Sequence, residues 1–290
     1  MKIANDVALV LQGGGTRGIF VAGVLDRLAK EEIEFQYVIG TSAGALGGSN
    51  YISGDIGRTQ FLIVHCMKSV KFASAANLLF TGTFFNFNYL MNTVPIKVSP
   101  MNFDRFNSNP AKFFVATTGV ADGRAHYFEK SSCSQFLKAI AASSSLPFIS
   151  KPVLVEGHYY LDGGPAAAIP FRKPIEDGLS KIVVVETRDP TYRKPETKKS
   201  TIRRTNQFYR KHKELSQAII NANKTYNDDV EEINRLKDEG RAFVIQPQQP
   251  VTIGRAERNE KKLNALYQEG YDLMESMLPD LKRFLGVADE

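Results

Sequence analysis

The first fifty residues contain two units in which an apolar run leads through a tight turn into a helical pattern. Residues 7–11 are all apolar, which is typical of a strand buried on both faces of a parallel sheet. A glycine-rich turn follows from residue 13, and apolar residues then recur at helical spacing over 21–28. The second unit has a strand at 37–39, a tight turn and a helix of small residues from Ala45 onward. Two such units predict neighbouring parallel strands joined by crossover helices.

The same alternation continues beyond these units, so we predict a three-layer α/β/α sandwich with a mainly parallel central sheet. The Asp-Gly pair at 122–123 is a strong hairpin signal between two strands. A second hairpin is expected at 153–161, directly before Asp162. The other expected strands are 113–118, 125–128, 182–185 and 242–245, and the expected helices are 135–145, 206–239 and 261–284.

Length and composition are those of an ordinary globular protein. The 290 residues suit one large α/β domain or one domain with an appendage. The first residues do not resemble a secretory signal, and no apolar stretch approaches the roughly 20 residues that span a bilayer. Cys66 and Cys133 are the only cysteines, so no disulfide framework is expected. We therefore expect a cytoplasmic protein.

Positive charge is modest overall but concentrated in one segment. The formal net charge is +6, whereas the run from Arg193 to Lys213 holds nine Lys or Arg residues and a single acidic residue, Glu196. This run is either a solvated surface or an electrostatic contact with anionic lipid head groups. We expect no nucleic-acid partner, and any peripheral membrane contact would use the run 193–213.

The turn of the second unit, Gly40-Thr41-Ser42-Ala43-Gly44, matches the G-x-S-x-G pattern of a nucleophile elbow. The pattern is short enough to occur by chance, but here an apolar strand precedes it and a helix follows it. Ser42 would stand on a sharp turn, with Gly40 and Gly44 at positions that bulky side chains could not occupy. The N-terminus of the following helix favours developing negative charge. Ser42 is thus the candidate nucleophile.

The glycine-rich turn of the first unit, Gly13-Gly14-Gly15-Thr16-Arg17-Gly18, has two interpretations. Its letters fit the dinucleotide-binding pattern G-x-G-x-x-G, which needs an acidic residue at the end of the second strand. That strand ends in Val38-Ile39-Gly40, without a carboxylate. The alternative is an oxyanion hole built from the backbone N–H groups of Gly13, Gly14 and Gly15, and it explains both turns together.

A serine nucleophile needs a base, and the four histidines are poorly placed to supply one. His65 falls in a predicted helix, His126 and His158 in hairpins, and His212 between two lysines whose charges lower its proton affinity. Asp162 ends a predicted strand and precedes Gly163 and Gly164, which suits exposure in a cleft. A lone Asp-Gly-Gly would otherwise be taken for a turn.

These three blocks, at 13–18, 40–44 and 162–164, resemble in order and spacing those of the patatin-like phospholipases. The segment 139–148, a small-residue helix that ends in proline, is also similar to one in that family. The resemblance covers residues 7 to about 190 and implies one patatin-like α/β domain over 1–290. The remainder, about 200–290, would be a helical extension that looks like a bacterial subgroup.

The resemblance implies a Ser42–Asp162 dyad that releases fatty acid from lipid esters without histidine, metal or other cofactor. Ser42 would attack the ester carbonyl, Asp162 would accept the proton, and an acyl-enzyme would then be hydrolysed by water. Supporting roles fall to Arg17, which would brace the glycine loop or meet a lipid phosphate, and to five glycines. These glycines are Gly18, Gly40, Gly44, Gly163 and Gly164.

Two other functions stay open beside hydrolysis of phospholipids or lysophospholipids. The same fold and dyad would serve a carboxylesterase of soluble short-chain esters, because a fold does not determine a substrate. A protein of a different class would bind nucleotide or lipid without catalysis. Residues 71–106 bear on the substrate, since they mix eight aromatic residues with Asn, Thr, Gly and Pro. They form either an irregular connection or an aromatic lid or wall beside an acyl-binding cleft.

Overall fold

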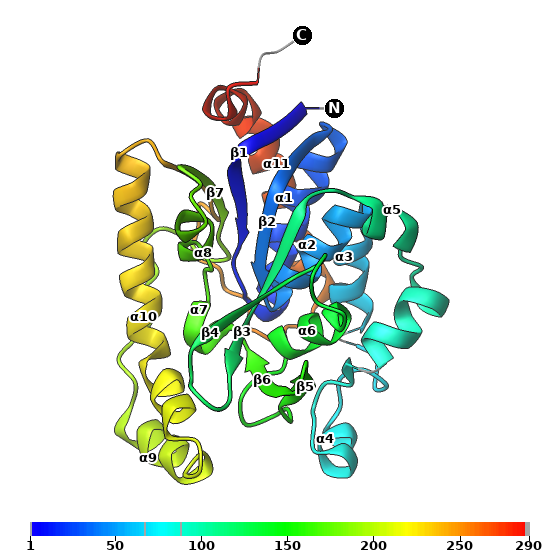
Figure 1. The fold of residues 1–290 in the computed structure, drawn as a ribbon. Helices are drawn as coiled ribbons and strands as arrows, with labels where there is room; N and C mark the ends of the chain where they lie inside the picture. Colours follow the sequence, from blue (N-terminus) through cyan, green and yellow to red (C-terminus); the bar gives the residue numbers. More distant parts are fainter. Residues whose placement is uncertain (1, 67, 88, 288–290) are drawn as a thin grey trace.

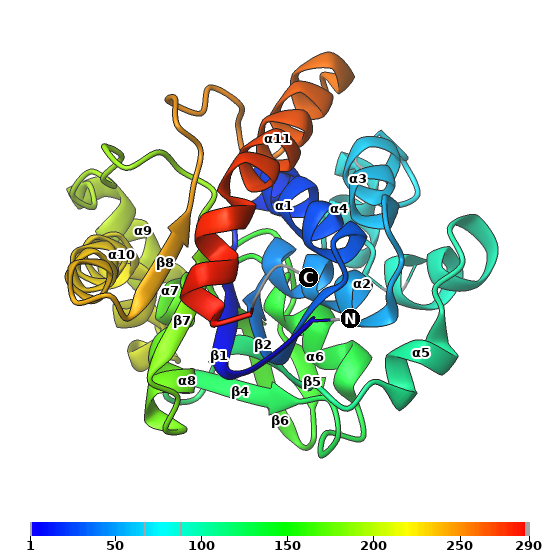
Figure 2. The same ribbon diagram turned by 90° about the horizontal axis from the view of Figure 1, so that it is seen from above.

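The computed structural model describes residues 2–66, 68–87 and 89–287, and one sheet with helices on both faces dominates it (Figures 1 and 2). The predicted α/β/α sandwich is therefore confirmed. The strand order is β5-β6-β3-β2-β1-β7-β8, and β4 pairs with β3. The strands are β1 (Lys2–Leu11), β2 (Ile33–Thr41), β3 (Lys112–Gly119), β4 (Ala125–Glu129), β5 (Val153–Val155), β6 (His158–Asp162), β7 (Lys181–Val185) and β8 (Ala242–Ile245).

The sheet is parallel in its centre and antiparallel at one side. Strands β3, β2, β1, β7 and β8 run parallel, whereas β4, β5 and β6 pair antiparallel in the two predicted hairpins. Thr41 at the end of β2 pairs with Ala116, and Asp162 at the end of β6 pairs with the next residue of β3, Thr117. Strand β3 therefore brings the ends of β2 and β6 together.

Successive side chains of the central strands point to opposite faces of the sheet and pack into two hydrophobic cores, one on each face. Leu9 and Leu11 of β1 point into one core, and Ala8 and Val10 point into the other. The first core is covered by α1 (Ile19–Lys30), α2 (Ala43–Ser53), α6 (Phe136–Ser143) and α11 (Glu260–Leu285), and the second by α8 (Arg172–Glu176), α10 (Lys213–Asp238) and the segment after α7 (Gly164–Ala167).

Helices α1 and α11 approach each other closely through two glycines. A Cβ added to Gly270 of α11 would lie 2.3 Å from the carbonyl oxygen of Phe20, and one added to Gly23 of α1 would lie 2.1 Å from that of Tyr267. Tyr267 also donates its hydroxyl to Asp26 Oδ2 at 2.8 Å. The C-terminal helix is thus docked on the first helix of the chain, and β8 extends the same sheet.

Between α2 and β3 the chain forms a series of short helices, in the region where residues 71–106 were expected to form an irregular connection or an aromatic lid or wall. Phe72, Phe85 and Phe87 line a cavity, whereas Phe106 lies in the core and Phe80 is exposed. Some of the aromatic residues of this region therefore form part of the cavity wall, whereas others lie in the core or on the surface. The elements of this region are α3 (Arg58–Phe61), the π-helices η2 (Leu62–Cys66) and η3 (Tyr89–Val98), α4 (Ala75–Thr81) and α5 (Phe103–Ser108).

The predicted single helix over 206–239 is wrong, because two helices meet there. Helix α9 (Lys199–Phe208) stops before Tyr209, and α10 begins at Lys213. Tyr209 and Leu215 are both buried with Leu161, and the hydroxyl of Tyr209 accepts the N–H of Phe148 at 3.0 Å. Burying both side chains in one cluster requires a turn between them, which no helical periodicity reveals.

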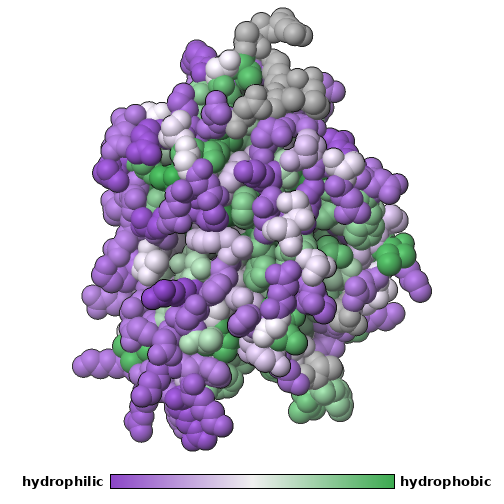
Figure 3. Space-filling model, in the orientation of Figure 1, coloured by the Kyte–Doolittle hydropathy of each residue, from purple (hydrophilic) through white to green (hydrophobic). Residues whose placement is uncertain are grey.

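The end of the molecule at which the parallel strands finish carries exposed apolar side chains (Figures 1 and 3). Helix α4 and helix α9 both project there, and the surface is green over α4 and mainly purple over α9. Leu79 and Phe80 of α4 are 79% and 83% exposed, and Phe208 of α9 is 61% exposed. Apolar and basic side chains therefore share this end of the protein.

The close contact of α1 and α11 predicts that Gly270→Ala destabilises the fold. The added methyl group would meet the Phe20 backbone, which cannot rotate away, so we expect a loss of about 1–3 kcal/mol of unfolding free energy despite the better helix propensity of alanine. Urea unfolding followed by circular dichroism measures it. Gly254→Ala is the matched control, because nothing lies within 4 Å of its added Cβ. Equal stability of the two variants would contradict the packing argument.

Candidate active site

Ser42 stands on a sharp turn between the end of β2 and the start of α2. Its backbone has φ 55° and ψ −120°, a left-handed conformation that is strained for a residue with a side chain. A Cβ on Gly40 would lie 2.6 Å from the backbone of Gly44, and one on Gly44 would lie 2.4 Å from the carbonyl oxygen of Leu11. The two glycines of the motif are therefore required by close backbone approach, as the sequence pattern predicts.

Ser143 of helix α6 fixes this turn through two hydrogen bonds. The backbone N–H of Ser42 donates to Ser143 Oγ at 2.8 Å, and Ser143 Oγ donates to the carbonyl of Ala116 at 2.6 Å. Both bonds are buried, so each is shielded from competing water. Ser143 lies within the small-residue helix noted in the sequence, but its role depends on a contact 101 residues away along the chain.

Asp162 ends β6 next to this turn and is fixed by several hydrogen bonds. Its N–H donates to the carbonyl of Ser145 at 2.8 Å, and its own carbonyl accepts the hydroxyl of Thr118 at 2.7 Å. Its side-chain Oδ1 accepts the N–H of Gly164 at 2.7 Å. A Cβ on Gly163 would lie 2.4 Å from the carbonyl oxygen of Ala116. The Asp-Gly-Gly block is thus packed tightly against β3.

Burial raises the pKa of Asp162 to about 6, because the charged carboxylate loses its hydration. The N–H of Gly164, the hydroxyl of Ser42 and the cations Arg255 and Lys194 act in the opposite direction without cancelling this effect. Asp162 Oδ2 is buried and has no partner at regular hydrogen-bond distance and angle among the described residues. The contact of Asp162 with Ser42 is therefore looser than a regular hydrogen bond.

The glycine loop lies against the serine turn, but its three N–H groups are not equivalent. Gly13 donates its N–H to the carbonyl of Ala168 at 3.1 Å, so the inclusion of Gly13 among the oxyanion donors is corrected. Gly14 and Gly15 donate to no acceptor in the part of the chain that the structure describes. The loop continues into the 3₁₀ turn η1 (Gly15–Gly18), which carries Arg17. Gly18 abuts the first residue of α2: its added Cβ would lie 2.6 Å from that of Ala43.

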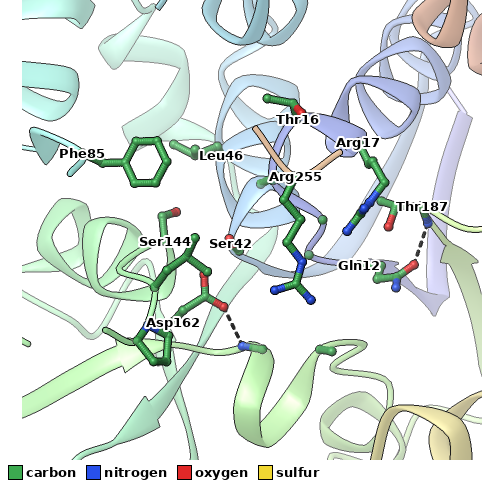
Figure 4. Close-up of a pocket in the computed structure, with 18 of the residues that line it drawn as sticks. Gln12, Thr16, Arg17, Ser42, Leu46, Phe85, Ser144, Asp162, Thr187 and Arg255 are labelled. Atoms are coloured by element: carbon green, nitrogen blue, oxygen red, sulfur yellow. Dashed lines mark hydrogen bonds between the residues drawn. The ribbon is translucent and has the colours of Figure 1, made fainter. Parts of the chain in front are cut away.

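A cavity of about 450 Å³ joins these parts and has two sides of different character. Figure 4 shows Leu46 and Phe85 on one side of Ser42, with Arg17 and Arg255 on the other. The apolar side is lined by Leu46, Leu62, Ile63, Phe72, Phe85 and Phe87. Ser42 and Asp162 lie where the two sides meet (Figure 4).

Of the polar side, only Arg17 was predicted from the sequence, as a residue that would brace the glycine loop or meet a lipid phosphate. Arg188, Lys194 and Arg255 line it together with Arg17, and Lys194 belongs to the basic run that was expected to be solvated or to face a membrane. Lys194 is in fact half-buried, with its ammonium 4.2 Å from the ring centre of Tyr226. No local pattern marks these residues, because they come from loops that meet only in the folded protein.

Histidine is absent from the walls of this cavity. All four histidines belong to the described part of the chain, and none of them lines it. His126 instead pairs with Asp122 at 2.8 Å. Within residues 2–66, 68–87 and 89–287, no three His, Cys, Asp or Glu side chains gather closely enough to hold a metal ion. The group beside Ser42 that can accept a proton is Asp162.

Two family models match the chain. The model described as patatin-like phospholipase matches residues 9–175, which include Ser42, Asp162 and the glycine loop. A second model, described as a domain of unknown function (DUF6363), matches residues 212–286, from the start of α10 to the end of α11. The first match contains all three blocks from which the sequence resemblance was drawn.

Curated relatives match about three fifths of the chain. An uncharacterized protein, YjjU of Escherichia coli K12, is 31% identical over 186 residues, which are 62% of this chain and 52% of that protein. The lysophospholipase NTE1 of Candida albicans is 27% identical over 187 residues, or 62% of this chain and 13% of that protein. The matched region thus spans about half of the first relative and a small part of the second.

A solved structure supports the fold. VipD from Legionella pneumophila superposes with a TM-score of 0.52 at 13% sequence identity, covering 95% of this chain and 67% of that one. At this identity the likeness concerns the arrangement of helices and strands. None of the helices among the described residues has the length and apolarity of a membrane span.

The raised pKa of Asp162 predicts that Asp162→Asn stabilises the fold in a pH-dependent way. The folded-state pKa of about 6 lies above the ordinary value of 3.8, so ionisation destabilises the protein as the pH rises through this interval. We expect the variant to exceed the wild type by on the order of 1–3 kcal/mol above pH 6, and to lose this advantage below pH 4.

Urea unfolding at a series of pH values measures this difference. Asp280→Asn on the exposed face of α11 is the control, since its carboxylate is 60% exposed and pairs only with Arg283 among the described residues. A stability difference between Asp162→Asn and the wild type that stays constant from pH 4.5 to pH 8 would contradict the prediction. It would show that ionisation of Asp162 does not destabilise the folded protein.

Proposed function

The chain belongs to the patatin-like phospholipase family, and we propose that it is a serine acyl-hydrolase of lipid esters, with Ser42 as nucleophile and Asp162 as base. The observation that carries the proposal is the position of Ser42. It stands on a strained turn beside a buried carboxylate, in a cavity whose walls include no histidine. A hydroxyl held in this way can transfer its proton directly to Asp162.

In the proposed reaction, Ser42 Oγ attacks the carbonyl carbon of the ester while its proton passes to Asp162. The tetrahedral intermediate then collapses, the C–O bond to the alcohol breaks, and Asp162 returns the proton to the leaving alkoxide. Water attacks the acyl-enzyme with Asp162 again as base, which releases the fatty acid and restores Ser42. The folded-state pKa of about 6 leaves Asp162 ionised at neutral pH, yet basic enough to take the proton.

The negative charge of the intermediate is stabilised by the N–H groups of Gly14 and Gly15. Both are free of other acceptors among the described residues, and the loop that holds them lies against Ser42: a Cβ added to Gly13 would be 3.2 Å from that of Ser42. The N-terminus of α2, which begins directly after Ser42, adds a favourable dipole. Each such donor contributes roughly a hundredfold to a thousandfold to the rate in comparable hydrolases.

A phospholipid or lysophospholipid suits the two-sided cavity better than a soluble short-chain ester. The apolar side accepts an acyl chain, the polar side accepts a charged head group, and the reacting serine lies between them. The relative from Candida albicans bears the name lysophospholipase, which agrees with this substrate class. A small soluble ester would leave the cationic side unused.

Peripheral contact with an anionic membrane is assigned to the end that carries α4 and α9. Phe148 lines the cavity, and its ring meets that of Phe208 of α9 edge to face, with the ring centres 5.3 Å apart. Phe84 donates its N–H to the carbonyl of Ile149, in the same loop as Phe148, at 2.7 Å. The two projecting helices therefore flank the site. Their exposed apolar residues can enter the lipid interface, while the basic residues of 198–213 meet anionic head groups.

This contact predicts that Leu79→Ser combined with Phe80→Ser weakens binding to vesicles of anionic phospholipid by about tenfold, because two exposed apolar side chains that would enter the lipid interface are removed. Sedimentation with the vesicles measures it. The control is Ile56→Ser, which removes an exposed apolar side chain between α2 and α3. If all these proteins sediment alike, α4 is not a membrane contact.

The assignment of the nucleophile predicts that a fluorescent fluorophosphonate labels the wild type and not Ser42→Ala. Ester hydrolysis should fall by about a thousandfold or more in Ser42→Ala and in Asp162→Asn, with native circular dichroism in both. Ser144→Ala is the matched control, because this serine also lines the cavity. Labelling that survives in Ser42→Ala but not in Ser144→Ala would move the nucleophile to Ser144.

A further inference from the structure

Four cationic side chains from three separate segments converge on the polar side of the cavity. Arg17 comes from the glycine loop, Arg188 and Lys194 follow β7, and Arg255 precedes α11. Figure 4 shows the guanidinium groups of Arg17 and Arg255 directed into the same space beside Ser42. Like charges repel each other at such close quarters, so this gathering needs an explanation.

The segment that carries Arg255 is docked on the glycine loop. The N–H of Thr16 donates to the carbonyl of Arg255 at 3.0 Å, and the hydroxyl of Thr16 donates to the carbonyl of Gly254 at 3.0 Å. The same hydroxyl accepts the N–H of Glu257 at 3.0 Å. Backbone contacts therefore hold this segment, and the Arg255 side chain is left to reach into the cavity.

Lys194 and Arg188 are also held by contacts that leave their charge available. Asn227 of α10 accepts the N–H of Lys194 at 2.8 Å and donates to its carbonyl at 2.9 Å. The guanidinium of Arg188 lies 4.2 Å from the ring centre of Tyr192, and its Nη1 donates to the carbonyl of Val251 at 3.0 Å. These positions are set by the fold and do not depend on a paired carboxylate.

The cluster lacks enough negative charge to balance it. Asp162 is the single acidic residue among the described residues that line the cavity. The Nε atoms of Arg17 and Arg188 are buried without a hydrogen-bond partner in residues 2–66, 68–87 and 89–287, and Arg17 is only 7% exposed. Burial and the neighbouring cations lower the pKa of Arg17 to about 10 and that of Lys194 to about 7. An anion bound here would relieve both the repulsion and the unpaired donors.

We propose that Arg17, Arg188, Lys194 and Arg255 form a subsite for the phosphate of an anionic lysophospholipid or phospholipid, one whose head group carries no ammonium group. This assignment rests on the proposed acyl-hydrolase function. In such a lipid the glycerol backbone places the phosphate only a few bonds from the carboxylic ester. A phosphate site beside Ser42 is therefore where the head group of a bound substrate must lie.

A choline or ethanolamine head group finds no matching partner in this subsite. A quaternary ammonium group is usually held by carboxylates or by open aromatic faces. Arg188 covers one face of the nearby Tyr192 ring and Lys194 covers one face of Tyr226, and the two rings also meet each other edge to face. Asp162, the one acidic side chain among the described residues of the cavity wall, is the proposed base. The cluster therefore selects for phosphate and against the zwitterionic head groups.

Binding of three C12 probes without a carboxylic ester tests the subsite apart from catalysis. Dodecyl phosphate, dodecylphosphocholine and 1-O-dodecylglycerol present an anionic, a zwitterionic and a neutral head group, and calorimetry below their micellar concentrations gives each Kd. We expect dodecyl phosphate to bind the wild type about tenfold or more tightly than the other two, since charge-assisted hydrogen bonds are the stronger ones. Comparable affinities for all three probes would overturn the proposal.

Two variants locate the effect within the cluster. Arg255→Gln and Lys194→Met keep the backbone contacts described above and should each reduce this preference about tenfold. Arg255→Lys should retain part of it. The matched control is Arg283→Gln, which removes a 77% exposed guanidinium from the end of α11. An unchanged preference in both cluster variants, or an equal loss in the control, would show that the subsite lies elsewhere.

Inorganic phosphate distinguishes a lipid head group from free phosphate as the natural ligand. It should compete with dodecyl phosphate only weakly, because it lacks the acyl-side contacts. Equal affinity for the two would contradict a lipid subsite.

Rates of ester hydrolysis test the phosphate subsite separately from the proposed hydrolase function. The ratio of kcat/KM for lysophosphatidylglycerol to kcat/KM for monoacylglycerol cancels any change in the ionisation of Asp162, because both esters need the same base. We expect this ratio to be high in the wild type and to fall about tenfold in Arg255→Gln. Hydrolysis of both esters without preference would refute the phosphate subsite but would still support the hydrolase function. Selective binding of dodecyl phosphate without hydrolysis of any ester would support the subsite and refute the hydrolase.

Discussion

The pairing of β3 with both β2 and β6 is the constraint on which the site depends. Thr41 lies opposite Ala116, and Asp162 lies opposite the next residue of the same strand. Two segments separated by 120 residues are thereby brought to one point, where Ser42 follows directly after Thr41. Slipping β6 by one residue would turn Asp162 to the opposite face of the sheet and remove the proposed base from the proposed nucleophile. The pairing of the strands thus positions the two residues of the proposed dyad.

Backbone strain and the burial of a charge both raise the free energy of the folded protein at this site, and the packing and hydrogen bonds around the site offset them. Ser42 has a strained backbone, and Asp162 loses hydration without a regular partner for its Oδ2. The buried hydrogen bond from the Ser42 N–H to Ser143 Oγ and the partly buried one from the Gly164 N–H to Asp162 Oδ1 hold these two residues where they are. Strain and unpaired groups of this kind persist only where the packed structure over-determines them. Their coincidence at one end of the sheet is a physical reason to place the chemistry there, independent of any motif.

Local sequence patterns could predict most strands, the serine turn and Asp162, because these depend on short-range periodicity and on glycines that close backbone contacts require. They could not predict the break between α9 and α10, since burial of Tyr209 and Leu215 in one cluster overrides the helical pattern. The use of the Gly13 N–H by Ala168 was equally hidden. Apart from Arg17, the cationic cluster could not be predicted either. Lys194 resembles the other lysines of the basic run in sequence, and only its hydrogen bonds with Asn227 in the folded protein hold its segment beside the cavity.

Positive charge in this protein therefore has two separate locations with different physical effects. Exposed cations of α9 and the following turn act through water, so salt screens them and they contribute attraction toward an anionic surface with little selectivity. The cations around Arg17 are enclosed by protein, where screening is weak and a bound group must match their geometry and charge. In the proposed function, the first set draws an anionic lipid to the surface, and the second set discriminates among head groups. Net charge alone could not distinguish these roles, because the same residues would give the same pI if all of them were solvated.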